Sequence, residues 1–229
     1  MVGSFVDGIL VASEEMVAHL RIAGFKCPIY VTGLPFGKKE VQSRAIPRKF
    51  MYRSDVIAYA ARLDSEKQPY FLMDVIKKVR TLEPACEFRI LSGGDLRSDD
   101  PAVVPALRAM ARKGEVTIYE NLLKNEYYRH LGESRVLFNC ALQDWVSNTV
   151  SEADALGCMT IFPAYRSFPE VFANNTHHMY IPWSVDDAAA KIIEGLTLTA
   201  KATNMGKISF CQFKSEILVI QSRNLLLGL

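Results

Sequence analysis

Two basic side chains, Arg62 and Lys67, lie in a polar loop that follows an apolar run and precedes a helical pattern. In an open α/β sheet such a loop lies at the carboxyl end of a strand, where ligands bind. Arginine offers a planar fork of donors and lysine a point charge, so the pair suits a diphosphate. The alternative is a solvated loop in which both cations pair with Asp64 and Glu66. Local chemistry alone favours this alternative.

A second polar segment, residues 143–152, combines a helix start with two carboxylates. Ser147 or Asn148 suits the N-cap of a helix that ends just before Gly157. The free amides and positive dipole end of a helix start suit a phosphate. Asp144 precedes the helix and can face a ligand, while Glu152 can accept hydrogen bonds from the vicinal hydroxyls of a ribose. An ordinary capped helix, with Asp144 in its entry loop and Glu152 exposed, is an equally open interpretation.

Other candidate residues carry weaker signals. Gly93 and Gly94 permit close approach to a ligand or simply form a tight turn, and an isolated glycine pair favours the turn. Trp145 can stack on a base or a sugar, although a tryptophan beside a helix cap is more often packed internally. The sequence has no dinucleotide-binding glycine fingerprint, no P-loop and no nucleophile elbow, and no further metal ligands accompany its four histidines. We therefore expect neither a metal site nor a bound cofactor.

These segments interrupt an alternation of short apolar runs and longer helical patterns. The short runs are apolar on both faces and are bounded by Gly, Pro, Ser or Asn, which is typical of buried parallel strands. The β-α-β-α order implies crossover connections and therefore an α/β fold, a doubly wound parallel sheet with helices on both faces. Strands are expected at 8–11, 29–32, 56–60, 88–91, 116–119, 136–139, 159–162 and 179–181. Helices are expected at 13–23, 69–82, 101–112, 125–131, 148–156 and 185–196.

The stretch 35–52 fits neither pattern, because it has two prolines, a glycine and mixed charge. It is typical of a linker. We therefore divide the chain into three parts: an N-terminal extension with linker (1–40), a Rossmann-like domain (41–205) and a C-terminal helix (206–229) whose apolar residues need a partner surface.

The composition is that of an ordinary globular protein, with 49% hydrophobic and 23% charged residues. The net charge of +2 is too small to indicate nucleic acid or an anionic membrane as a partner. No apolar run approaches the roughly 20 residues of a membrane span, and the N-terminus lacks the basic region of a signal peptide. Five cysteines, an odd number without a C-x-x-C pair, argue against a zinc site and a disulfide framework. We expect a cytoplasmic protein.

The order of these segments resembles the C-terminal, donor-binding domain of retaining GT-B glycosyltransferases, the group 1 type that includes sucrose- and glycogen-synthase-like enzymes. The resemblance covers most of residues 8–203 and rests on several weak motifs in a family-like order. The clearest is Asp144-x7-Glu152, followed by Ala-Asp-Ala-Leu-Gly, which is similar to the family's paired acidic residues with their alanines and glycine. The other matching segments are 11–13, Gly24, 29–33, 60–68, 88–94 and Pro169-Glu170.

The resemblance implies roles for individual residues. In the family, the residues matching Arg62 and Lys67 bind the donor diphosphate, the one matching Glu152 binds the ribose, and the one matching Asp144 approaches the donor sugar. Backbone amides of the segment matching 146–149 contact the donor. The resemblance thus implies a nucleoside diphosphate sugar as donor, an unidentified acceptor, and transfer with retention, without metal or cofactor. The expected site comprises Asp144 as the catalytic group, with Arg62, Lys67, Gly93, Gly94, Ser147, Asn148, Thr149 and Glu152 binding the donor.

Three departures from the family pattern keep other functions open. Asp144 stands where the family usually has the longer glutamate, and Val146 or Ser147 stands where it often has glycine. The family enzyme also needs an N-terminal domain that holds the acceptor, and residues 1–34 resemble only its last β-α-β segment. The chain is then a fragment, a subunit whose partner chain supplies the rest, or a non-catalytic regulatory or assembly module. A nucleotide-sugar epimerase of the same fold is a further alternative.

Overall fold

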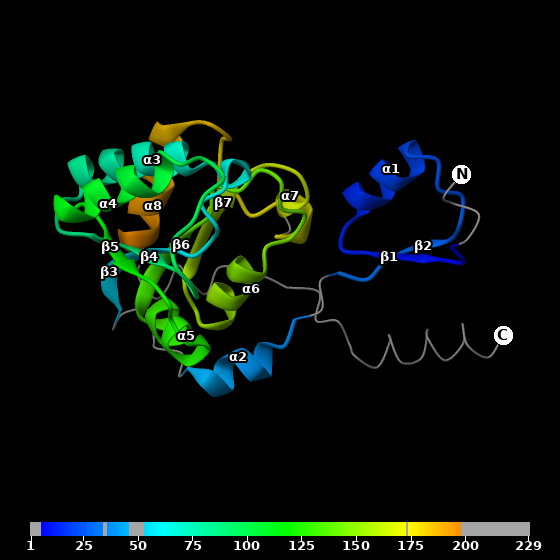
Figure 1. Cartoon of the computed structure of the whole chain (residues 1–229). Coiled ribbons are helices and arrows are strands. Elements are labelled where there is room, and N and C mark those ends of the chain that lie inside the picture. The colour runs from blue at the N-terminus through cyan, green and yellow to red at the C-terminus, as the bar shows by residue number, and fades with distance from the viewer. Residues whose placement is uncertain (1–5, 34–35, 46–52, 173, 198–229) are drawn as a thin grey trace.

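The computed structural model describes residues 6–33, 36–45, 53–172 and 174–197 (Figure 1). These residues form a two-stranded sheet near the N-terminus and a six-stranded sheet that follows it. The C-terminal helix that the sequence predicts within 206–229 lies outside the described residues. No helix in the described part of the chain has the length and apolar character of a membrane span.

The larger sheet is doubly wound. Its strands are β3 (Ser54–Tyr59), β4 (Glu87–Leu91), β5 (Thr117–Tyr119), β6 (Ser134–Phe138), β7 (Met159–Pro163) and β8 (Met179–Tyr180). They lie in the order β5-β4-β3-β6-β7-β8, and all neighbouring pairs are parallel. The chain enters at β3, builds outward through β4 and β5, and then returns to add β6, β7 and β8 on the other side of β3. The order therefore reverses between β3 and β6, and open α/β sheets bind their ligands outside the carboxyl ends of the strands at such a switch point.

Helices cover both faces of this sheet (Figure 1). One layer contains α3 (Pro69–Leu82), α4 (Val103–Arg112) and α8 (Val185–Thr197), and the other contains α2 (Lys38–Arg44), α5 (Lys124–Glu133) and α6 (Asn148–Ala155), with the short α7 (Phe168–Val171) at its edge. Each layer closes its own hydrophobic core. The consecutive residues Ile57 and Ala58 of β3 are fully buried, one in each core. A central strand covered on both faces is apolar where it is buried, which explains the run from Val56 to Tyr59 after the exposed Ser54 and Asp55.

The local sequence also explains why individual helices form. Helix α3 begins with Pro69, where the missing amide would have no helical partner. Its apolar residues Leu72, Val75, Ile76 and Val79 follow the i, i+3, i+4, i+7 spacing, and all four are fully buried. The helix therefore presents one continuous apolar stripe to the sheet.

The N-terminal part is a small β-α-β unit that contacts the larger one. It consists of β1 (Ile9–Val11), α1 (Glu14–Ile22) and β2 (Ile29–Val31), with the two strands parallel. Helix α1 has a Ser13 N-cap, and Gly24 adopts a positive φ of 90° just past its end. The Glu170 carboxylate accepts hydrogen bonds from the backbone amides of Glu14 (2.9 Å) and Glu15 (3.4 Å). A carboxylate at this helix start opposes the positive end of the dipole and ties α1 to the segment of α7.

The α/β doubly wound fold is confirmed, and so are the eight strands and six helices predicted from the sequence, with ends shifted by at most two residues. The linker prediction for 35–52 is wrong at Lys38–Arg44, because these residues form α2. Its only apolar residue, Val41, is buried against the core that α5 and α6 share. Two short elements were not predicted from the sequence: α7 and a 3-10 turn at Ser65–Lys67.

Candidate functional site

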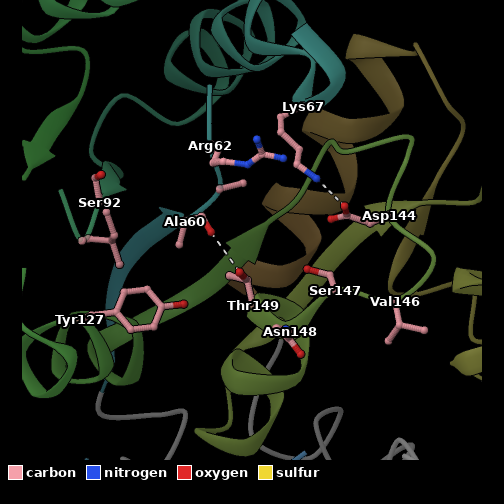
Figure 2. Close-up of a pocket in the computed structure, with 13 residues that line it drawn as sticks. Ala60, Arg62, Lys67, Ser92, Tyr127, Asp144, Val146, Ser147, Asn148 and Thr149 are labelled. Carbon is pink, nitrogen blue, oxygen red and sulfur yellow. Dashed lines mark hydrogen bonds and ion pairs between the residues drawn. The ribbon is translucent and has the colours of Figure 1, made fainter. Parts of the chain in front are cut away.

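A cavity of about 430 Å³ lies at the carboxyl ends of the strands, at the switch point between β3 and β6 (Figure 2). Its volume is within the range of small-molecule sites. The lining comes from the loops after β3, β4 and β6, from the start of α6 and from one side chain of α5. The lining residues are Ala60, Ala61, Arg62, Lys67, Leu91, Ser92, Gly93, Tyr127, Asp144, Val146, Ser147, Asn148 and Thr149. Seven of the nine residues expected from the sequence are therefore brought together here, and Gly94 and Glu152 are not among the lining residues.

The basic corner of the cavity is formed by Arg62 and Lys67, and both side chains are paired. The Arg62 guanidinium is 2.6 Å from Asp64 and also pairs with Glu66. Lys67 is buried; it pairs with Asp144, as the dashed line in Figure 2 marks, and lies 3.6 Å from Glu66. Two cations thus face three carboxylates, a net charge of −1 (+2 − 3). An anionic ligand would have to replace these carboxylates as the partner of each cation.

The start of α6 forms the opposite wall. The Ser147 hydroxyl caps the helix by accepting a hydrogen bond from the Val150 amide at 3.4 Å. The Thr149 hydroxyl donates to the Ala60 carbonyl at 3.1 Å, which fixes the helix start against the end of β3. Among the described residues, the backbone amides of Asn148 and Thr149 have no acceptor. Since they belong to the first turn, they are available to an anion in the cavity.

Glu152 is half-buried next to the cavity lining and contacts two tyrosines that were not predicted from the sequence. The Tyr127 hydroxyl donates to one of its carboxylate oxygens and the Tyr128 hydroxyl to the other, each at 2.9 Å. Burial and the nearby Glu152 charge raise the pKa of Tyr127 well above its ordinary value, so this hydroxyl stays protonated and remains a donor. Tyr127 also lines the cavity, and Figure 2 shows its hydroxyl pointing toward Thr149. A paired aromatic motif at the start of a helix that follows a strand is the signal that would have identified it.

The two glycines contribute open space rather than a required backbone conformation. Neither Gly93 nor Gly94 has a positive φ. A side chain at Gly93 would make only ordinary contact, 3.8 Å from the Leu122 carbonyl, and nothing lies within 4 Å at Gly94. The turn interpretation therefore accounts for this pair, although Gly93 does line the cavity.

Histidines and acidic residues do not assemble into a metal site in the part of the chain that the structure describes. His178 is buried and hydrogen-bonds to the Thr160 carbonyl at 2.7 Å, while His19 on α1 contacts the Trp145 ring edge-to-face at 4.9 Å. Burial lowers the pKa of His178, so it is neutral at pH 7. The polar groups that face the cavity are the Arg62 and Lys67 cations, side-chain hydroxyls, backbone amides and the Asp144 carboxylate.

Comparison with solved structures identifies the class to which this architecture belongs. The chain superimposes on sucrose-phosphate synthase from Thermosynechococcus elongatus with a TM-score of 0.74 at 16% identity, covering 99% of this chain and 59% of that one. For α,α-trehalose 6-phosphate synthase from Burkholderia multivorans the TM-score is 0.73 at 12% identity, covering 97% of this chain and 59% of that one. For the pneumococcal O-GlcNAc transferase GtfA, in complex with UDP and GlcNAc, the TM-score is 0.60 at 13% identity, covering 90% of this chain and 40% of that one. The fold is therefore that of a GT-B Rossmann-like domain, and the chain spans little more than half the length of the first two structures.

The family model of group 1 glycosyltransferases matches residues 54–197, which is more than half of the chain and contains the whole larger sheet and its helices except α2. The chain belongs to this family. No curated protein sequence matches it. The expected resemblance to the family is therefore confirmed.

Proposed function

We propose that the cavity binds a nucleoside diphosphate sugar and that the chain is the donor-binding half of a glycosyltransferase that transfers the sugar to an acceptor with retention of configuration. The observation that carries this proposal is the meeting of Arg62, Lys67 and the free amides of α6 around one cavity. These groups offer cationic and dipolar stabilisation to a diphosphate. The UDP complex of the pneumococcal transferase is consistent with the same ligand class.

The diphosphate would bind by exchange of partners. Its oxygens replace Asp64 and Glu66 at the Arg62 fork, and replace Asp144 at Lys67. The amides of Asn148 and Thr149 complete the cradle. As the bond to the sugar breaks, negative charge develops on the leaving diphosphate, and the same groups stabilise it without a metal ion.

The ribose would be held by Glu152. A carboxylate has about four lone-pair sites, and the two tyrosine hydroxyls use two of them. Two sites therefore remain for vicinal ribose hydroxyls, and the tyrosines fix the orientation of the carboxylate. Asp144, once released from Lys67, is the carboxylate nearest the donor sugar in this scheme.

Titration calorimetry with UDP, GDP, ADP and TDP tests the proposal. We expect one of these nucleotides to bind, and Arg62→Ala and Lys67→Ala each to weaken binding at least tenfold, because each removes a charge-assisted contact worth about 1.5–3 kcal/mol. Lys77→Ala is the matched control, since Lys77 pairs with Asp74 on the exposed side of α3. Unchanged affinity in both cavity variants would remove the diphosphate assignment.

A non-catalytic module with the same fold is the second candidate. The paired state of both cations and the shorter Asp144 carboxylate favour it. A turnover assay with the preferred nucleotide sugar, performed on the chain alone and with candidate partner chains, distinguishes the two functions. Donor hydrolysis or transfer in any of these mixtures supports the enzyme, whereas nucleotide binding without turnover in all of them supports the module.

A further inference from the structure

Three aromatic rings and one arginine form a continuous stack along the carboxyl edge of the larger sheet. Trp145 follows β6, Tyr165 and Arg166 follow β7, and Trp183 follows β8. The Arg166 guanidinium lies 4.8 Å from the centroid of the Trp145 ring and 5.6 Å from that of Tyr165. The Tyr165 and Trp183 rings meet edge-to-face at 6.0 Å. We call these four residues the edge stack.

The far end of the edge stack is open to solvent. Trp183 is 63% exposed and Tyr165 is 37% exposed, whereas Phe162 and Phe168 in the same region are buried. Hydrophobic burial therefore does not explain why the two outer rings lie where they do. Large exposed rings at a ligand-binding edge are typical of a surface that takes a ligand.

Two members of the edge stack also have an unfavourable backbone conformation. Arg166 and Trp183 adopt positive φ values of 51° and 62°. A left-handed conformation is costly for a residue with a bulky side chain, and such residues cluster at functional sites. Of the five described non-glycine residues with a positive φ, these two belong to the edge stack, and the other three are Gln68, Asn121 and Asn174.

The Arg166 guanidinium contacts a backbone carbonyl rather than a carboxylate in the described part of the chain. Its Nε donates to the Leu142 carbonyl at 3.2 Å. Within the described residues no carboxylate lies within ion-pair distance of it, in contrast to Arg62 and Lys67, whose partners are in place. A guanidinium held between two rings, with fork donors to spare, is suited to a phosphate or carboxylate group.

From these observations we propose that the edge stack binds an anionic sugar, with its ring against the exposed aromatic faces and its phosphate or carboxylate on Arg166. The surface adjoins the donor cavity, because Trp145 lies between Asp144 and Val146, which both line that cavity. A sugar held there would lie beside the donor sugar of the proposed function, so that the two could react. This assignment rests on the proposed function and names the chemical class of an acceptor that this domain would help to bind.

Intrinsic fluorescence offers a selective test, because the chain contains two tryptophans and both belong to the edge stack. The probes are glucose 6-phosphate and glucuronate, with glucose and inorganic phosphate as half-ligands. We expect a saturable fluorescence change with at least one anionic sugar, and at least tenfold weaker binding of both half-ligands. Arg166→Gln should bind the anionic sugar no more tightly than glucose, and Tyr165→Ala should bind it no more tightly than inorganic phosphate. Arg112→Gln, which removes an exposed arginine at the end of α4, should have the same affinities as the parent.

The proposal is overturned if neither anionic sugar gives a saturable change, if inorganic phosphate binds as tightly as glucose 6-phosphate, or if Arg166→Gln binds like the parent. A thermal-shift measurement with nucleoside diphosphates on the same samples separates the two assignments. A nucleotide-dependent shift without sugar binding contradicts only the edge stack. Sugar binding without any nucleotide-dependent shift contradicts only the donor site.

Discussion

Replacing Asp144 with asparagine should increase the affinity of the chain for a nucleoside diphosphate. In the free structure Asp144 is the ion-pair partner of Lys67, with side chains that are 24% and 10% exposed. A diphosphate competes with this carboxylate for the lysine and is also repelled by it. Removing the negative charge removes the competitor, while Glu66, 3.6 Å from the lysine, still limits the cost of leaving a buried cation unpaired.

The size of the effect follows from the burial of the pair. A partly buried ion pair of this kind is worth about 1 kcal/mol, the upper end of the range for exposed pairs. Affinity should therefore rise about fivefold, since 1.4 kcal/mol corresponds to a factor of ten. Turnover should fall in the same variant, because it loses the carboxylate that we propose to lie nearest the donor sugar.

The assay is titration calorimetry with the nucleotide that raises the melting temperature of the parent most. Asp74→Asn is the matched control, because it removes a carboxylate paired with a lysine on the exposed side of α3 and should leave the affinity unchanged. If Asp144→Asn binds the nucleotide no more tightly than the parent, then Lys67 is not where the diphosphate binds, and the exchange of partners described above is wrong.

Three further predictions concern the cavity wall, the core and pH. Tyr127→Phe should weaken nucleotide binding about threefold to tenfold without loss of folding, because Glu152 loses a hydrogen bond that orients it; calorimetry and circular dichroism check the two parts. Gly195→Ala should destabilise the fold by about 1–3 kcal/mol in urea unfolding, because its new methyl group would lie 3.0 Å from Val136. Gly132→Ala, with open space around it, should be neutral or stabilising. Burial raises the pKa of Asp154 to about 6, above about 3.9 in the unfolded chain, so protonation favours the folded state. The stability of the parent relative to Asp154→Asn should therefore rise as pH falls from 7 to 4, and a constant difference across that range would refute the shift.

Much of the fold could be predicted because most of its strands and helices have a clear local sequence pattern. Strand β3 is apolar at every central position, and α3 carries an uninterrupted helical stripe after a proline. Helix α2 carries no such signal. Its seven residues contain one apolar side chain, Val41, so the helix depends on tertiary contacts: Val41 packs into the core that α5 and α6 share, and the Gln42 amide donates to the Ala155 carbonyl at 2.8 Å.

The candidate site could be predicted in part, for a related reason. Arg62, Lys67 and the start of α6 follow strands, so the parallel topology alone brings them to one edge of the sheet. The pairing of Lys67 with Asp144 joins residues 77 positions apart. The contact of Tyr127 with Glu152 likewise depends on how α5 and α6 pack, which the spacing of residues in the sequence does not encode.

The same limit applies to the edge stack. Its four residues follow three different strands, and Trp145 alone gives no reason to connect it with Trp183. Once β6, β7 and β8 are adjacent and parallel, their following loops must meet at one edge. A sequence interpretation that paired these loops by strand order would have found the aromatic cluster.

A crystal structure of the chain with its preferred nucleoside diphosphate is the sharpest test of the proposed donor site. We expect phosphate oxygens within about 3 Å of the Arg62 and Lys67 side chains and of the Asn148 and Thr149 amides, with Asp144 no longer in contact with Lys67. A nucleotide bound elsewhere on the molecule, or one bound in the cavity with the Lys67–Asp144 pair still intact, would contradict it.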